Sequence, residues 1–151
     1  SILNMKTYVG KVGKFQSVQE AANAMREISK GFGPHTSEEW LALSKHMVRS
    51  VEEGAFSLHY DPAIGVPVAK VTQEQALAGE AALWQVYDLI QSPTLLIHGA
   101  QSELLSVSAA QEMQQRGPRV QVATLEGVGH APTLTHEYQI DIVRRFLGLH
   151  A

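Results

Sequence analysis

The sequence predicts an α/β fold, in which a mainly helical first part is followed by a strand, helix, strand and helix. Two observations predict it. Up to about residue 90, apolar residues recur at helical spacing. Beyond that point, two predicted strands at 94–97 and 120–125 alternate with helical patterns, as in a parallel crossover unit with right-handed geometry. The chain has 151 residues and is 44% hydrophobic, which is enough for one domain with a real core.

The first part begins with a predicted helical hairpin. Ser17 and Glu20 have the spacing of a capping box and open a helix that runs to about residue 29. After a glycine- and proline-containing break, Thr36 and Glu39 open the next helix in the same way. The apolar residues of the two helices are Val18, Ala21, Ala22, Met25, Ile28, Trp40, Leu41, Leu43, Met47 and Val48.

The remainder of the first part has a weaker pattern. A turn at residues 52–54 precedes the alternating stretch from Ala55 to Tyr60, which is compatible with a short strand or with an extended segment. Asp61-Pro62 ends that stretch, because the residue before a proline avoids the helical region. A short apolar helix is expected around residues 83–89.

The second part opens with a buried strand. Residues 94–97, Thr-Leu-Leu-Ile, form an uninterrupted apolar run bounded by Pro93 and Gly99, as expected for a parallel strand that is covered on both faces. The helical pattern from Ser106 to Arg116 follows, and the sequence Gly117-Pro118 closes it.

A second strand and a glycine-rich loop complete the pattern. Residues 120–125 form the strand, and the loop 127–132 reads Gly-Val-Gly-His-Ala-Pro. The final helix carries its apolar face at Ile140, Val143, Phe146 and Leu147.

Composition excludes several classes of function. The net charge is −3 with acidic and basic residues mixed, so nucleic acid is not an expected partner. Cysteine is absent, which excludes disulfides and thiolate catalysis, and cytoplasm is the expected compartment. No apolar stretch approaches the ~20 residues that span a bilayer, so no membrane association is expected.

Two residues at the ends of the predicted strands could carry chemistry. His130 lies in the loop after the second strand, and Glu103 lies in the loop after the first. Parallel strands place these loops at one edge of the sheet, where ligand crevices occur. A carboxylate that orients an imidazole leaves the other ring nitrogen free to act as a general base. The plainer interpretation is a loop histidine that packs or bonds to backbone, with a solvated carboxylate.

The segments Pro93–Ser106 (PTLLIHGAQSELLS) and Gly127–Pro132 (GVGHAP) resemble the last two signature regions of α/β-hydrolase fold enzymes. The resemblance implies that His130 is the catalytic base. It implies Glu103 as the acid, although aspartate is more usual and some relatives take the acid from an earlier strand.

The resemblance also divides the chain. Residues 1–90 resemble the helical cap or lid, and residues 91–151 the C-terminal part of the hydrolase core, so the expected fold is a cap followed by the final parallel strand-helix-strand-helix of an incomplete α/β-hydrolase domain. Phe32, Trp40 and Met47 are either pocket wall or, as we favour, ordinary core.

The nucleophile of that family is missing from this sequence. No serine has the Gly-x-Ser-x-Gly setting of the nucleophile elbow, and no aspartate or cysteine elbow replaces it. The backbone donor that follows the nucleophile is therefore missing too. We expect the chain to be the C-terminal part of an enzyme that hydrolyses a small ester or carbonyl-type substrate through nucleophile, histidine and acid, and to be inert by itself.

Two other interpretations stay open. The chain could be a non-catalytic binding or dimerisation module, or its parent could be a dehalogenase or epoxide hydrolase with an aspartate nucleophile. No cofactor is implied. No metal site is expected, because His136-Glu137 lacks the second histidine of a zinc motif at Ile140. The other histidines are expected to be surface or packing residues: His35, His46, His59, His98 and His150. The expected partners are a small-molecule substrate and either a second copy or the other half of the enzyme.

Overall fold

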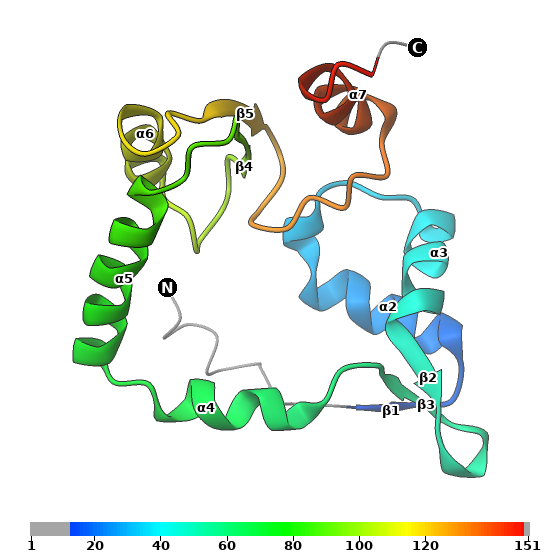
Figure 1. Ribbon diagram of the computed structural model, residues 1–151. Coiled ribbons are helices and arrows are strands. Elements are labelled where there is room, and N and C mark those ends of the chain that lie inside the picture. The colour runs from blue at the N-terminus through cyan, green and yellow to red at the C-terminus, as the bar shows by residue number, and fades with distance from the viewer. Residues whose placement is uncertain (1–12, 150–151) are drawn as a thin grey trace. The chain divides into compact units, whose positions relative to one another are not determined.

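The computed structural model describes residues 13–149 (Figure 1). These residues fall into two compact units. Residues 13–30 and 34–77 belong to one, called here the N-terminal unit. Residues 31–33 and 78–149 belong to the other, the C-terminal unit. His150 lies outside the described residues.

Two capped helices form the helical hairpin of the N-terminal unit, α2 (Val18–Ile28) and α3 (Ser37–Met47). The Glu20 backbone N–H donates to the Ser17 side chain at 3.1 Å, which confirms the first predicted cap. The second cap is reciprocal, because the Glu39 N–H donates to Thr36 Oγ1 at 3.2 Å and the Thr36 N–H donates to the Glu39 carboxylate at 2.7 Å. The buried apolar residues of these helices are Ala21, Ala22, Met25 and Trp40.

A small antiparallel sheet completes the N-terminal unit, in the order β1-β3-β2. Its strands are β1 (Lys14–Phe15), β2 (Val48–Ser50) and β3 (Phe56–Leu58). The 3₁₀ turn η2 (Glu52–Gly54) connects the last two. Only the third strand was foreseen, since strands of two or three residues are too short to show a clear alternation.

The chain then passes through η3 (Pro62–Ile64) and α4 (Gly65–Lys70) into the long helix α5 (Gln73–Asp88). This helix is 16 residues long, whereas the sequence predicted a short one around residues 83–89. The reason is a second reciprocal capping box, because the Gln75 N–H donates to Thr72 Oγ1 at 3.1 Å and the Thr72 N–H donates to the Gln75 side chain at 3.0 Å.

The C-terminal unit contains the predicted strand-helix-strand-helix sequence. Strands β4 (Leu95–Gly99) and β5 (Gln121–Leu125) pair in parallel, from Leu95 opposite Gln121 to Gly99 opposite Leu125. Helix α6 (Val107–Gln115) connects them, and α7 (Glu137–Phe146) follows the glycine-rich loop. The buried apolar residues here are Ala110, Val120, Leu125 and Val128. The 3₁₀ turn η1 (Lys30–Phe32) follows α2, and its residues 31 and 32 already belong to the C-terminal unit.

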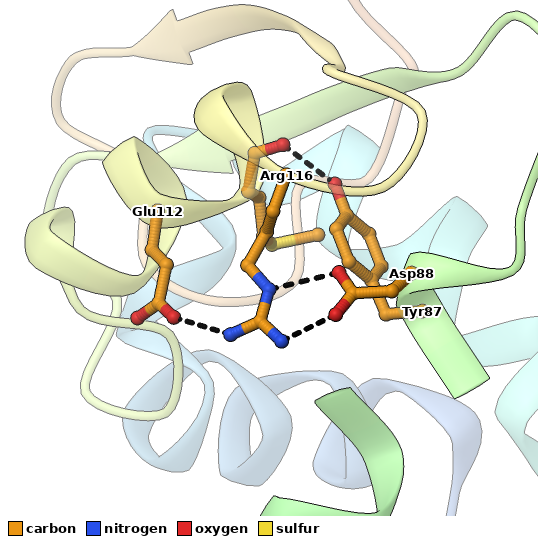
Figure 2. Close-up of polar contacts among 5 residues, drawn as sticks. Tyr87, Asp88, Glu112 and Arg116 are labelled. Carbon is orange, nitrogen blue, oxygen red and sulfur yellow. Dashed lines mark hydrogen bonds and ion pairs between the residues drawn. The ribbon is translucent and has the colours of Figure 1, made fainter. Parts of the chain in front are cut away.

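A charged cluster joins the end of α5 to the end of α6 (Figure 2). The guanidinium of Arg116 donates to both carboxylate oxygens of Asp88 and, at 2.6 Å, to Glu112. It also lies over the Trp84 ring, 4.6 Å from the centroid. The hydrogen bonds from Arg116 hold the pKa of the Asp88 carboxyl below its ordinary value. The same bonds raise the pKa of Arg116, so this junction is ionic at neutral pH.

Tyr87 strengthens the same junction. Its hydroxyl donates to the Met113 carbonyl at 2.8 Å (Figure 2), and its ring meets that of Trp84 edge-on. Partial burial, together with the charge of Asp88, raises the pKa of the phenol.

Within residues 13–149, no helix has both the length and the apolar character needed to cross a membrane.

Candidate active site

The loops that follow β4 and β5 are joined along their backbones. Beyond the paired strands, the Ala100 N–H donates to the Leu125 carbonyl at 2.9 Å. The Gln101 N–H then donates to the Val128 carbonyl, also at 2.9 Å. The two loops that carry the predicted site residues therefore lie side by side, as the crossover topology required.

Glycines allow this junction to be very close. A Cβ at Gly99 would lie 1.8 Å from the Gly129 carbonyl oxygen, a distance that no side chain can occupy. On the other side of the loop, the Gly129 N–H donates to the Gly31 carbonyl at 2.6 Å. A Cβ at Gly129 would lie 2.9 Å from the Gly31 Cα. The residue before His130 is thus held between two backbone segments, which fixes the path of the loop.

His130 presents its side chain at the surface of this junction. Its Nδ1 lies 3.1 Å from Ser102 Oγ, in the loop after β4. Ser102 is itself fixed, because its Oγ accepts the Leu105 N–H at 3.0 Å and its N–H donates to the Gly99 carbonyl at 3.0 Å. Which of Nδ1 and Ser102 Oγ donates depends on the imidazole tautomer. The other ring nitrogen, Nε2, is the one that a general base would use.

Glu103 is exposed and directly follows Ser102 in the loop after β4. The structure brings together the two loops that carry His130 and Glu103, and it places the hydroxyl of Ser102 at the Nδ1 side of the ring. The role of Glu103 as the acid stays a prediction. Sequence reasoning missed Ser102, because the path of the loop decides which of two adjacent polar side chains meets the imidazole.

Two further residues that the sequence singled out have packing roles. His98, on β4, is buried, and its Nε2 lies 3.0 Å from the Leu105 carbonyl. Trp40 is only 4% exposed and its ring lies 5.3 Å from that of His35, which confirms the interpretation as core. Among the described residues, no three His, Asp or Glu side chains gather as a metal ion would need.

Comparisons with known proteins agree with the fold. The sequence is 39% identical over 142 residues to the 3-hydroxybutyrate-oligomer hydrolase of Cupriavidus necator, a match that covers 92% of this chain and 48% of that protein. The fold matches a Rickettsia typhi protein described as a hydrolase, with a TM-score of 0.81, 25% identity, and 99% of this chain and 49% of the other covered. No family model matches the sequence.

An α/β hydrolase from Novosphingobium aromaticivorans also matches, with a TM-score of 0.73 and 27% identity over 99% of this chain and 52% of the other. The chain has the α/β-hydrolase fold. It spans about half the length of the curated relative that it matches, so it corresponds to an incomplete α/β-hydrolase domain.

Proposed function

We propose that this chain carries the general base of an ester hydrolase, and that His130 is that base. The observation that carries the proposal is the setting of His130. It is an exposed imidazole beyond the end of a parallel strand, and one ring nitrogen is already engaged by Ser102 at 3.1 Å. A histidine held in this way can exchange a proton through its other nitrogen.

In the proposed reaction, Nε2 of His130 accepts the proton of the nucleophile as the nucleophile attacks the ester carbonyl. The resulting imidazolium then gives that proton to the departing alkoxide, which leaves as the alcohol while the acyl group stays on the nucleophile. His130 next takes a proton from the water that attacks this acyl-enzyme and returns it to the nucleophile, which releases the acid. A carboxylate near the ring stabilises the imidazolium, and Glu103 is the residue proposed for this role. The nucleophile and the oxyanion donors come from outside the 151 residues, because the sequence contains no nucleophile elbow.

The proposed substrate class is a short ester of a hydroxy acid. Its support is the 39% identity to a hydrolase of 3-hydroxybutyrate oligomers. Esters of this class carry a carbonyl for the nucleophile and an alkoxide leaving group that needs a proton. Both requirements match a single histidine that acts first as base and then as acid.

The test uses the product of the complete gene that encodes this chain, assayed on 3-hydroxybutyrate dimers and on activated esters. We expect saturable hydrolysis that His130→Ala lowers at least about a thousandfold in kcat/KM. His46→Ala, which changes an exposed histidine on α3, is the matched control and should keep wild-type rates. A His130→Ala enzyme with normal turnover would remove the proposed base.

The 151-residue chain by itself provides a second comparison. Without nucleophile and oxyanion donors, it should hydrolyse activated esters no faster than free imidazole does. If the gene encodes only this chain and that chain is inert, the binding or dimerisation module becomes the better interpretation. Robust turnover by the isolated chain would instead reveal a nucleophile among its own serines.

Glu103→Gln separates the charge of the proposed acid from its shape. Because Glu103 is exposed, water screens its interaction with the imidazolium. We therefore expect a loss in kcat of about tenfold, well below the ~10⁴-fold loss typical of a buried acid bonded directly to the histidine. An unchanged kcat would show that the acid lies elsewhere in the enzyme.

We also infer that the C-terminal unit associates with further chain, either a second copy or the rest of the domain. Within residues 13–149, β4 and β5 form a sheet of two strands, which is small for a stable sheet. Leu83, Val86 and Leu89, on or just after α5, are 61–77% exposed. Light scattering with intact-mass analysis should find a dimer or a bound second polypeptide, and a stable monomer at high concentration would contradict this.

A further inference from the structure

We propose that Ser102 is the positioning residue of His130, and that its hydroxyl oxygen accepts the Nδ1–H of the imidazole. The proposal rests on the proposed function, in which His130 is the base. It assigns to a neutral hydroxyl the task that a carboxylate performs in a nucleophile-histidine-acid triad, namely to fix the tautomer and the orientation of the ring.

The hydrogen-bonding capacity of Ser102 supports this assignment. A serine hydroxyl can accept two hydrogen bonds and donate one. The Leu105 N–H takes one acceptor position at 3.0 Å, and the imidazole Nδ1 lies 3.1 Å away in reach of the second. With both acceptor positions filled, the imidazole carries its proton on Nδ1, and Nε2 keeps the lone pair that a base needs.

The backbone around Ser102 gives the contact its rigidity. Its N–H is bonded to the Gly99 carbonyl at 3.0 Å, and the preceding Gln101 N–H is bonded to the Val128 carbonyl at 2.9 Å. The position of the hydroxyl is therefore tied to the ends of both strands. Serine also has a single side-chain torsion, so holding it still costs less conformational entropy than holding a glutamate.

Ser102 and Glu103 divide the two tasks of a triad acid. A hydroxyl orients the imidazole but carries no charge to stabilise the imidazolium, whereas Glu103 carries the charge one residue further along the loop. Loss of Ser102 should therefore lower kcat through the orientation and tautomer of the ring. The contact lies on the Nδ1 side of the ring and not on the Nε2 side that would act on the substrate, so KM should change little.

The direct test is ¹⁵N NMR of the histidine side chains in the 151-residue chain, at about pH 9, where histidine rings are neutral. We expect the His130 signals to show a proton mainly on Nδ1. Ser102→Ala should shift the ring toward the other tautomer, and Ser102→Thr should restore the wild-type pattern. If the wild-type ring is protonated mainly on Nε2, or if Ser102→Ala leaves its tautomer unchanged, the proposal is wrong.

Ser106→Ala is the matched control, because it removes a hydroxyl from the same loop. Ser106 Oγ accepts the Ala109 N–H at 3.1 Å and caps α6, and it makes its side-chain contact with Ser108. The control should lower stability without moving the His130 tautomer. A tautomer shift of equal size in Ser106→Ala would mean that general loosening of the loop explains the effect.

Kinetics on the complete gene product separate this inference from the proposed function. We expect Ser102→Ala to lower kcat about tenfold with KM unchanged, and Ser102→Thr to recover most of the loss. If His130→Ala abolishes activity while Ser102→Ala has wild-type kcat, the base stands and the positioning role falls. If His130→Ala is fully active, the proposed function fails, whatever the NMR shows.

Discussion

At the His130 loop, the C-terminal unit is held together by backbone atoms, whereas at the end of α5 it is held by charged side chains. The first junction consists of glycines whose backbones touch, with Gly129 bonded to Gly31 at 2.6 Å and packed against Gly99. The second consists of Arg116 between two carboxylates, with about a third of its side chain exposed.

The two junctions are sensitive to different changes. Backbone contacts cannot yield to an added side chain, because the atoms that would have to move belong to the backbone of β4 and of the segments packed against its end. Exposed ion pairs can rearrange, and salt or a change of pH weakens them. The junction that sets the position of His130 is thus the rigid one, as a general base requires.

The largest effect should come from Gly99→Ala. Its Cβ would meet the Gly129 carbonyl oxygen at 1.8 Å, so β4 and the His130 loop cannot both keep their positions. We expect the free energy of unfolding in urea to fall by roughly 3 kcal/mol or more. Gly79→Ala, on α5 with nothing within 4 Å of the new Cβ, should instead gain about 0.5–1 kcal/mol. Equal stabilities of the two variants would contradict this account of the junction.

A smaller loss should follow Gly117→Ala, next to the charged junction. Gly117 has φ of +53°, and an added Cβ would lie 2.7 Å from the Tyr87 carbonyl oxygen. Backbone strain and the clash together should cost about 2–3 kcal/mol. Gly148→Ala isolates the strain, because Gly148 has φ of +70° but nothing within 4 Å. Thermal or urea unfolding should show the larger loss for Gly117→Ala, and a reversed order would rule out the contact with Tyr87 as its cause.

The contrast between the two junctions also marks how far the sequence could predict the structure. Helix starts at Ser17 and Thr36 were predictable because capping is a local interaction, and β4 because an apolar run bounded by Pro93 and Gly99 is typical of a parallel strand. The place of His130 in the loop after β5 was predictable for the same local reasons, whereas its role as the base stays a proposal. The contact with Ser102 joins residues 28 positions apart, and only the folded loop decides it.

Other features escaped for comparable reasons. The start of α5 was missed even though Thr72 and Gln75 have capping-box spacing, because the weak apolar pattern of its first turns hid the local signal. That Gly99 must be glycine follows from Gly129, which is distant in sequence. The short strand β2 begins at Val48, which the helical pattern had predicted to be part of the preceding helix. Local chemistry therefore fixed the elements, and the contacts between them decided the site.

The smallest effect concerns the charged junction and its dependence on pH. Hydrogen bonds from Arg116 depress the pKa of Asp88 in the folded chain. A depressed carboxyl pKa contributes stability that is complete above the unfolded value of about 3.9 and is lost as the pH falls through the lower folded value. The stability difference between wild type and Asp88→Asn should therefore be constant near pH 7 and shrink below about pH 4. Because both partners are partly exposed, 1 M NaCl should reduce the same difference.

Arg145→Met is the control for this prediction. It alters an exposed arginine of α7, and its stability difference from wild type should depend neither on pH nor on salt. A difference between wild type and Asp88→Asn that persists unchanged in acid and in high salt would show that packing, for example of Arg116 on Trp84, holds this junction instead of charge.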